Sequence, residues 1–165
     1  DLEQSEYVTD KYYVYGSKGL MGIYSRATDA VTYADSLFGT VVEDSGELLW
    51  GRIIKPELAK LSDTSALVSK GYTSLEMVME DADYEAVDIS GVDISALLYF
   101  GAYDIPVITY LNDYGCVILS AYSGYKGNID TLAFTVCQSG EIIKMSYQEA
   151  KNALEAAGAR YLAVK

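Results

Sequence analysis

Three apolar segments follow one another closely in the second half of the chain, and they constrain the fold more than any other feature. They span 107–111, 116–122 and 132–137, and polar or glycine-containing stretches separate them. Apolar runs of this length between turn residues are typical of strands, and short connections join antiparallel neighbours. The sequence therefore predicts an antiparallel sheet. Three weaker strand patterns extend it, at 86–89, 141–145 and 161–164.

Helix signals lie between and after these strands. Thr73–Glu76 and Ser146–Glu149 are capping boxes, in which a hydroxyl residue stands three positions before Glu. Asp93 precedes an apolar stripe that predicts a helix over 94–103, and Gly158 ends the predicted terminal helix. Helices combined with hairpin-linked strands predict an α+β fold, with an antiparallel sheet or half-barrel and packed helices.

The N-terminal part of the chain has a pattern of its own. It predicts, in order, strands at 11–16 and 20–25, a helix at 27–38, and strands at 40–43 and 48–52. Phe38 belongs to the apolar stripe of the helix, and Gly39 is expected to stop it. We therefore predict a small ββαββ module over 1–54 and a second domain over 55–165.

The strand pairing in the second domain follows from its apolar residues. One register places all apolar pairs of the 116–122 and 132–137 hairpin on one face, which is how register is normally fixed. It puts Tyr122 on the face opposite Leu119. The pairs are Val117 with Val136, Leu119 with Phe134, and Ala121 with Leu132. The predicted core comprises Leu97, Leu98, Val107, Ile108, Val117, Leu119, Phe134, Val136 and Leu154.

The same register sets the two cysteines of the chain, Cys116 and Cys137, opposite each other. Directly opposed residues are within disulfide reach, so a disulfide between them is one expectation. The alternative is a pair of unbonded, half-buried thiols that act as small hydrophobic side chains.

Charge and length limit the partners. The formal net charge is −12, whereas nucleic acids and anionic lipid surfaces attract basic proteins, so neither is an expected partner. No apolar run approaches the roughly 20 residues of a membrane-spanning helix, so this segment is not expected to insert into a membrane. Phosphate-binding and dinucleotide-binding glycine motifs are absent from the sequence, and no cofactor is predicted.

Five short motifs in the second half of the chain occur in an order that a known peptidase family also shows. They are Asp88-Ile-Ser-Gly-Val-Asp-Ile-Ser95, Leu97-Leu-Tyr-Phe100, Ile105-Pro-Val-Ile108, Cys116-Val-Ile-Leu-Ser-Ala-Tyr122 and Lys144-Met145-Ser146. In this order they resemble the second half of papain-like cysteine peptidases of the bacteriocin-leader-processing, or double-glycine, kind. The resemblance implies a papain-like domain over 55–165.

The family's catalytic groups are missing. Aligned on the motif that ends at Tyr122, the family histidine falls on Gly115, and the 165 residues contain no histidine at all. No cysteine stands where the family nucleophile begins a helix. A thiol peptidase needs both groups, so the resemblance implies a non-enzyme. We expect a vestigial cleft at Tyr110, Asn112, Gly115 and Cys116.

The N-terminal module is also similar to a module beside such domains in clostridial surface proteins. The similarity rests on Tyr13-Val-Tyr15, Ala30–Asp35, Gly39–Val42 and Leu49-Trp50-Gly51-Arg52. It implies an extracytoplasmic or cell-surface setting, within a larger bacterial protein. The expected function is a catalytically inactive module that binds a protein or peptide, or serves as a structural part. The alternative is self-association through exposed tyrosines. The chain contains 16 tyrosines in all.

Carboxylates are the remaining candidates for chemistry. An acidic stretch contains Asp81, Asp83, Glu85, Asp88 and Asp93, but it lacks the spacing of a calcium-binding loop. It is interpreted as a solvated acidic linker with a helix cap, and no metal site is predicted. A hydrolase that uses paired carboxylates is a remote alternative, because a sequence does not show their separation in space.

Overall fold

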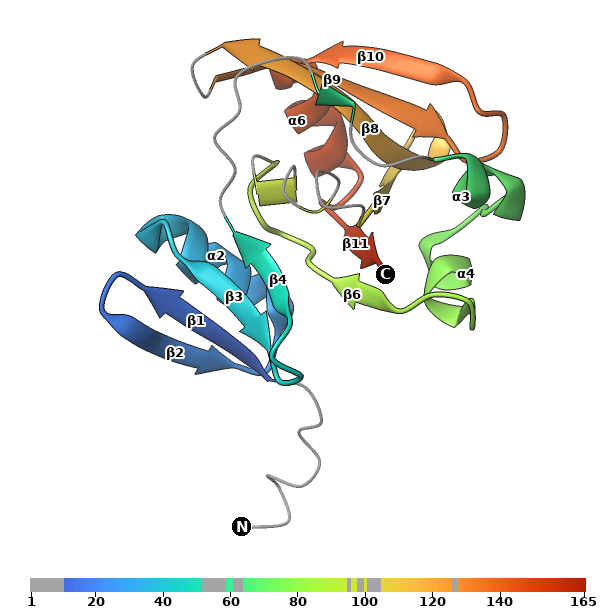
Figure 1. The fold of residues 1–165 in the computed structure, drawn as a ribbon. Coiled ribbons are helices and arrows are strands. Elements are labelled where there is room, and N and C mark those ends of the chain that lie inside the picture. The colour runs from blue at the N-terminus through green and yellow to red at the C-terminus, as the bar shows by residue number, and fades with distance from the viewer. Residues whose placement is uncertain are drawn as a thin grey trace. The chain divides into compact units, whose positions relative to one another are not determined.

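The computed structural model describes residues 11–51, 59–60, 64–94, 96–97, 100, 105–125 and 128–165 (Figure 1). The chain divides into two compact units, Asp1–Arg52 and Ile53–Lys165, so the boundary precedes the predicted one at 54. Both units combine helices with antiparallel sheets, which confirms the predicted α+β class. Neither sheet closes into a barrel within the described ranges.

The first unit is a four-stranded antiparallel sheet with one helix. Its elements are β1 (Tyr12–Gly16), β2 (Gly19–Tyr24), α2 (Ala27–Leu37), β3 (Thr40–Glu43) and β4 (Leu48–Gly51). The strand order is β2-β1-β3-β4, as the ββαββ pattern allows. The helix contributes Ala27, Ala30, Val31 and Ala34 to a fully buried layer. Small alanines at these positions let α2 lie close to the sheet.

The end of α2 differs from the prediction. Phe38 does not join the buried stripe: it is 69% exposed, and it adopts the left-handed conformation with φ of 54°. The next residue must be glycine for a steric reason. A Cβ on Gly39 would lie 2.3 Å from the carbonyl oxygen of Tyr15, so only glycine lets β3 leave the helix this close to β1.

The second unit is built on one large antiparallel sheet. Its strand order is β10-β9-β8-β7-β11-β6, and β5 pairs with β8. The strands are β5 (Ala59–Lys60), β6 (Ala86–Asp88), β7 (Val107–Leu111), β8 (Gly115–Tyr125), β9 (Asn128–Val136), β10 (Ile142–Ser146) and β11 (Tyr161–Val164). The helices are α3 (Ser65–Lys70), α4 (Leu75–Glu80) and α6 (Tyr147–Ala156). All predicted strands of this unit are present, whereas α3 was not predicted.

Hydroxyl caps set the starts of α4 and α6. Ser146 and Glu149 form the predicted capping box, with both reciprocal bonds, of 3.1 and 3.0 Å, present. At α4 the cap is Ser74 rather than Thr73, because the Ser74 hydroxyl accepts the backbone N–H of Met77 at 3.2 Å. Thr73 instead donates its hydroxyl to the sulfur of Met77.

Among the described helices, none combines the length and apolar composition that a membrane crossing requires.

The central strands of the large sheet are buried on both faces. One face contacts α6, and it includes Val117, Leu119 and Phe134. The other face, with Ile108, lies under α3 and α4, so Ile108 belongs to a second layer and not to the single predicted core. The other predicted core residues are buried, except Leu98, which lies outside the described residues. Of the helix predicted over 94–103, only Ile94, Ala96, Leu97 and Phe100 are described, and they are helical.

A β-bulge at Ser120 changes the predicted register. Val117 pairs with Val136 and Leu119 with Phe134, as predicted. Beyond the bulge, Ala121 pairs with Ala133 and not with Leu132, which pairs with Tyr122. One extra residue on one strand reverses the alternation of its side chains. Tyr122 therefore lies on the same face as Leu119, with only 2% of its surface exposed, and the predicted opposite placement is wrong.

Candidate functional site

The β7–β8 hairpin brings together the four residues of the predicted vestigial cleft. Tyr110 pairs with Cys116, and Gly115, the first residue of β8, follows the turn with φ of 79°. Asn112 donates a side-chain N–H to the backbone carbonyl of Ala156 at 3.3 Å, which links the turn to the end of α6. The turn is tight because glycine accepts the left-handed conformation at its exit.

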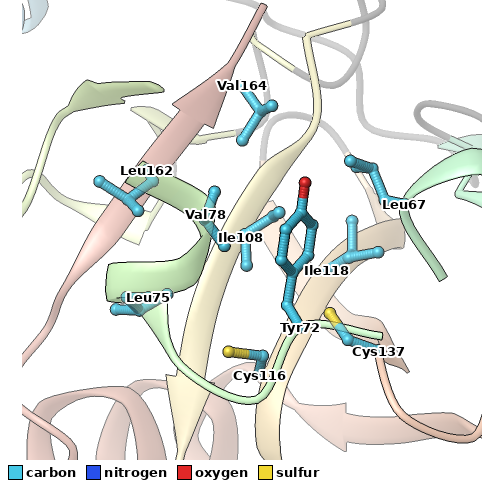
Figure 2. Packing of buried hydrophobic residues seen from close by; sticks show 10 residues of the cluster. All are labelled: Leu67, Tyr72, Leu75, Val78, Ile108, Cys116, Ile118, Cys137, Leu162 and Val164. Carbon is cyan, nitrogen blue, oxygen red and sulfur yellow. The ribbon is translucent and has the colours of Figure 1, made fainter. Parts of the chain in front are cut away.

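Cys116 does not line an open cleft. Its exposed fraction is 0%, and its side chain belongs to a cluster of buried hydrophobic residues (Figure 2). Tyr110 packs against the same cluster. Cys116 is thus part of the hydrophobic core, so the predicted cleft is filled at this residue.

The two cysteines are opposed, as the register predicts. The backbone N–H of Cys137 donates to the carbonyl of Cys116 at 3.0 Å, and both side chains are fully buried. Both are free thiols, so the predicted disulfide is not formed. Figure 2 gives the reason: the sulfur of Cys116 points away from Cys137, and the sulfur of Cys137 points toward Tyr72.

A helical segment closes this face of the sheet. We call residues 64–84, which contain α3 and α4, the cover. Leu67, Tyr72, Leu75 and Val78 of the cover are buried in the cluster. They pack with residues of β7, β8 and β11, namely Ile108, Cys116, Ile118, Leu162 and Val164, and with Cys137, which follows β9. The cover therefore excludes water from both thiols.

Polar groups on the cover form a compact network around Asp81. The Tyr72 hydroxyl donates to a carboxylate oxygen of Asp81 at 2.7 Å. Lys70 Nζ lies 3.2 Å from that carboxylate and also pairs with Asp83. The ammonium lies 5.5 Å from the ring centre of Tyr84, within cation–π range. The sequence predicted a solvated acidic linker here. In the structure, Asp81 and Asp83 are instead paired with the ammonium group of Lys70.

Two side chains outside the cover tie it to the rest of the unit. Gln138, in the turn after β9, donates one side-chain nitrogen to the backbone carbonyls of Gly71 and Tyr72, at 2.8 and 3.1 Å. Arg160, just before β11, pairs with Glu76 of α4 at 3.0 Å. Arg160 and Glu76 are substantially exposed, and Gln138 is exposed as well, although its bond to the Tyr72 carbonyl is partly buried.

Burial makes both thiols poor nucleophiles. It raises the pKa of Cys116 to about 11, with a smaller contribution from the negative charge of Glu76. Burial, and then the neighbouring Cys116, raises the pKa of Cys137 to about 12. Because the thiolate is the reactive form, neither sulfur is activated at neutral pH. Tyr72 also has a raised pKa, from burial and from its bond to Asp81.

Hydrogen bonds and ion pairs lower the pKa values of the carboxyl groups on the cover. The backbone N–H of Asp83, then the Tyr72 hydroxyl and Lys70, lower the pKa of Asp81. Arg160 lowers the pKa of Glu76 in the same sense. In the described residues, no group of three or more metal-binding side chains could hold a metal ion.

Sequence reasoning did not identify the cover as the element that fills this site. The capping motif and the spacing of Leu75 and Val78 indicated α4 and its apolar stripe, but nothing local indicated which face of the sheet the helix would cover. Gln138 bonds Gly71 and Tyr72, which precede it by 67 and 66 positions, so its role could not be read from its neighbours in the sequence. No known family, curated protein or solved structure matches this chain.

Proposed function

We propose that this chain is a catalytically inactive, peptidase-like module that acts in binding, or as a structural part, within a larger extracytoplasmic bacterial protein. One observation carries the proposal: Cys116, next to the position of the family's histidine, is a fully buried core thiol. The chain also has no histidine to act as its base. The setting rests on the resemblance of the N-terminal module to clostridial surface proteins.

The alternative of a carboxylate-based hydrolase has less support. Such an enzyme needs one carboxyl group that stays protonated near neutral pH, which requires a raised pKa. Asp81, Glu76 and Glu149 have lowered pKa values instead, because each accepts hydrogen bonds in its ionised form. These groups are stabilised as carboxylates and serve the fold as ion-pair and capping partners.

A comparison of two proteins tests the absence of catalysis. The native chain and a Cys116→Ala variant are incubated with a mixture of peptides, and cleavage products are quantified by mass spectrometry. We expect equal, background cleavage by both proteins. Cleavage by the native chain that the variant lacks would contradict the proposal. Cys137→Ala serves as the matched control, because it removes a thiol of similar burial just after β9.

The open face of the four-stranded sheet favours self-association as a second candidate function. On the side away from α2, one row crosses all four strands: Ile23, Tyr13, Val42 and Leu48 pair in turn. Ile23 and Leu48 are 53% and 49% exposed. Exposed apolar side chains that are grouped on a surface usually mark a contact with a partner. A second copy offers an equally flat face, and two such faces stack at about 10 Å as in a β-sandwich.

Sedimentation measurements test this second function. The sheet is only four strands wide, about 14 Å between the outer strands, so the dimer is expected to be weak and protein concentrations up to about 1 mM are needed. We expect the native chain to associate and Ile23→Lys to stay monomeric. Ile142→Lys is the control, since Ile142 is similarly exposed, at 63%, on β10 of the second unit. A native chain that stays monomeric throughout contradicts self-association through this face.

A further inference from the structure

We propose that Cys116 and Cys137 form a modification site: a covered dithiol that closes to an intramolecular disulfide when a peroxide reaches it. Access is controlled by the cover. This inference is independent of the proposed function, since it concerns the chemistry of the two sulfurs and not a binding partner.

The backbone already holds the two residues at a suitable separation. Cys137 donates its N–H to the carbonyl of Cys116 at 3.0 Å, which continues the β8–β9 ladder by one pair. Opposed residues of a hydrogen-bonded pair have Cα atoms about 5.5 Å apart. This lies within the roughly 4.4–6.8 Å that a disulfide spans. Both side chains lie on the sheet face that the cover closes.

Closure requires a movement of side chains and not of the strands. The sulfur of Cys116 points away from Cys137, while that of Cys137 points toward Tyr72 (Figure 2). A rotation of the Cys116 side chain would bring the two sulfurs together. Both side chains are packed in the cluster under Tyr72 and Leu75, where a close-packed interior opposes rotation. The rotation therefore needs the cover to lift.

The cover is suited to lift as a unit. It consists of two helices of six residues each, and its densest polar network, around Asp81, lies within the cover itself. Its polar attachments to the rest of the unit include Gln138, which bonds Gly71 and Tyr72 between the two helices, and Arg160, which pairs with Glu76. Segments with few attachments open locally at lower free-energy cost than the whole fold.

The reaction balances with hydrogen peroxide as the oxidant. One thiol, after loss of its proton, attacks an oxygen of the peroxide; the O–O bond breaks, and a sulfenic acid and water form. The second sulfur, also deprotonated, then attacks the sulfenic sulfur. The S–S bond forms, the S–O bond breaks, and a second water leaves. Two thiols are oxidised and one peroxide is reduced to two waters. Because the thiols stay protonated while the cover is closed, the opening of the cover sets the rate of disulfide formation.

The experiment compares oxidation rates of the native chain, Gln138→Ala and Gln148→Ala. Each protein is treated with hydrogen peroxide, quenched at intervals, digested without reduction and analysed by mass spectrometry for the linked Cys116–Cys137 peptide. Gln138→Ala removes two hydrogen bonds that hold the cover, so we expect linkage to be about tenfold faster. Gln148→Ala removes an exposed side-chain bond to Asn152 on α6, and its rate should match the native chain.

The pattern of linkage among these proteins either supports or overturns the covered dithiol. Faster linkage in Gln138→Ala alone, with none in Cys116→Ser, supports the covered dithiol. Equal linkage rates in the native chain and Gln138→Ala would overturn control by the cover. Failure of all three proteins to link would overturn the site itself, as would oxidation that gives only intermolecular dimers or sulfinic acids. Circular dichroism shows whether Gln138→Ala retains the native fold, as expected for an exposed residue.

Discussion

Tyr122 pairs with Leu132 across the β8–β9 ladder, one residue later than an unbroken ladder from the Val117–Val136 pair would place it. The bulge at Ser120 accounts for the shift, and the Ser120 hydroxyl donates to the carbonyl of Ala133 at 3.1 Å. The cysteine pairing lies on the other side of the bulge and is unaffected. The same hairpin thus follows its predicted register at one end and departs from it at the other.

Tyr122→Ala should consequently be a severe change. Tyr122 is 2% exposed on the same face as Leu119, so both Tyr122→Ala and Leu119→Ala leave cavities in a packed layer. We expect each to lower the free energy of unfolding by about 2–5 kcal/mol. Chemical denaturation measures this, with Tyr114→Ala as the control, because Tyr114 is 40% exposed. A Tyr122→Ala variant as stable as Tyr114→Ala would contradict the bulge.

The Tyr72 hydroxyl should stabilise the cover. Tyr72→Phe keeps the buried ring and removes only the 2.7 Å bond to the carboxylate of Asp81. A hydrogen bond to a charged group contributes about 1.5–3 kcal/mol, so we expect a loss of that order in guanidinium denaturation. Tyr114→Phe, at an exposed position, should change stability by far less. Equal stabilities for the two variants would show that the network contributes nothing measurable.

The acid limb of the stability curve should depend on Asp81. Its pKa in the folded chain is lowered, so its contribution is fully present above the unfolded value, about 3.9, and is lost as the pH falls below that value toward the folded one. We expect the denaturation midpoint to fall steeply below pH 4 in the native chain and less steeply in Asp81→Asn. Asp113→Asn, on the exposed β7–β8 turn, is the control. An unchanged slope in Asp81→Asn would remove Asp81 from this account.

The alkaline limb should depend on the two thiols. Their pKa values are raised to about 11 and 12, so their contribution is fully present below the unfolded value, about 8.5, and is lost as the pH rises toward the folded values. Stability should therefore fall above pH 9. In Cys116→Ala the fall should be shallower, because one of the two buried thiols is gone. Denaturation midpoints between pH 7 and 10.5 measure this, and parallel curves would contradict it.

Local patterns carried much of the fold. Strand β7 and the terminal strand β11 have the predicted bounds, and the Ser146–Glu149 box starts α6 as expected, because periodicity and capping depend on neighbours in sequence. The opposition of Cys116 and Cys137 followed from the apolar pairs of one hairpin. These features need no knowledge of the rest of the chain.

Features set by distant contacts were not predictable in this way. Phe38 adopts the left-handed conformation at the end of α2, and glycine is required at position 39 by the close approach of Tyr15, which is remote in sequence. The bulge at Ser120 is not visible in the sequence, because the residues on either side of it form a continuous apolar run without alternation. The burial of Cys116 depends on a cover whose residues lie more than thirty positions earlier, so the cleft expected there proved to be filled.

The rate of labelling at Cys116 tests the central claim, an inactive core thiol, most directly. The native chain and the guanidinium-unfolded chain are treated with the same peptide-like, thiol-directed electrophile, and modification at Cys116 is followed by peptide mapping. The account predicts much slower labelling in the native chain, because the thiol is fully buried and its pKa is raised. Faster labelling of Cys116 in the native chain than in the unfolded chain would reveal an activated nucleophile and contradict the account.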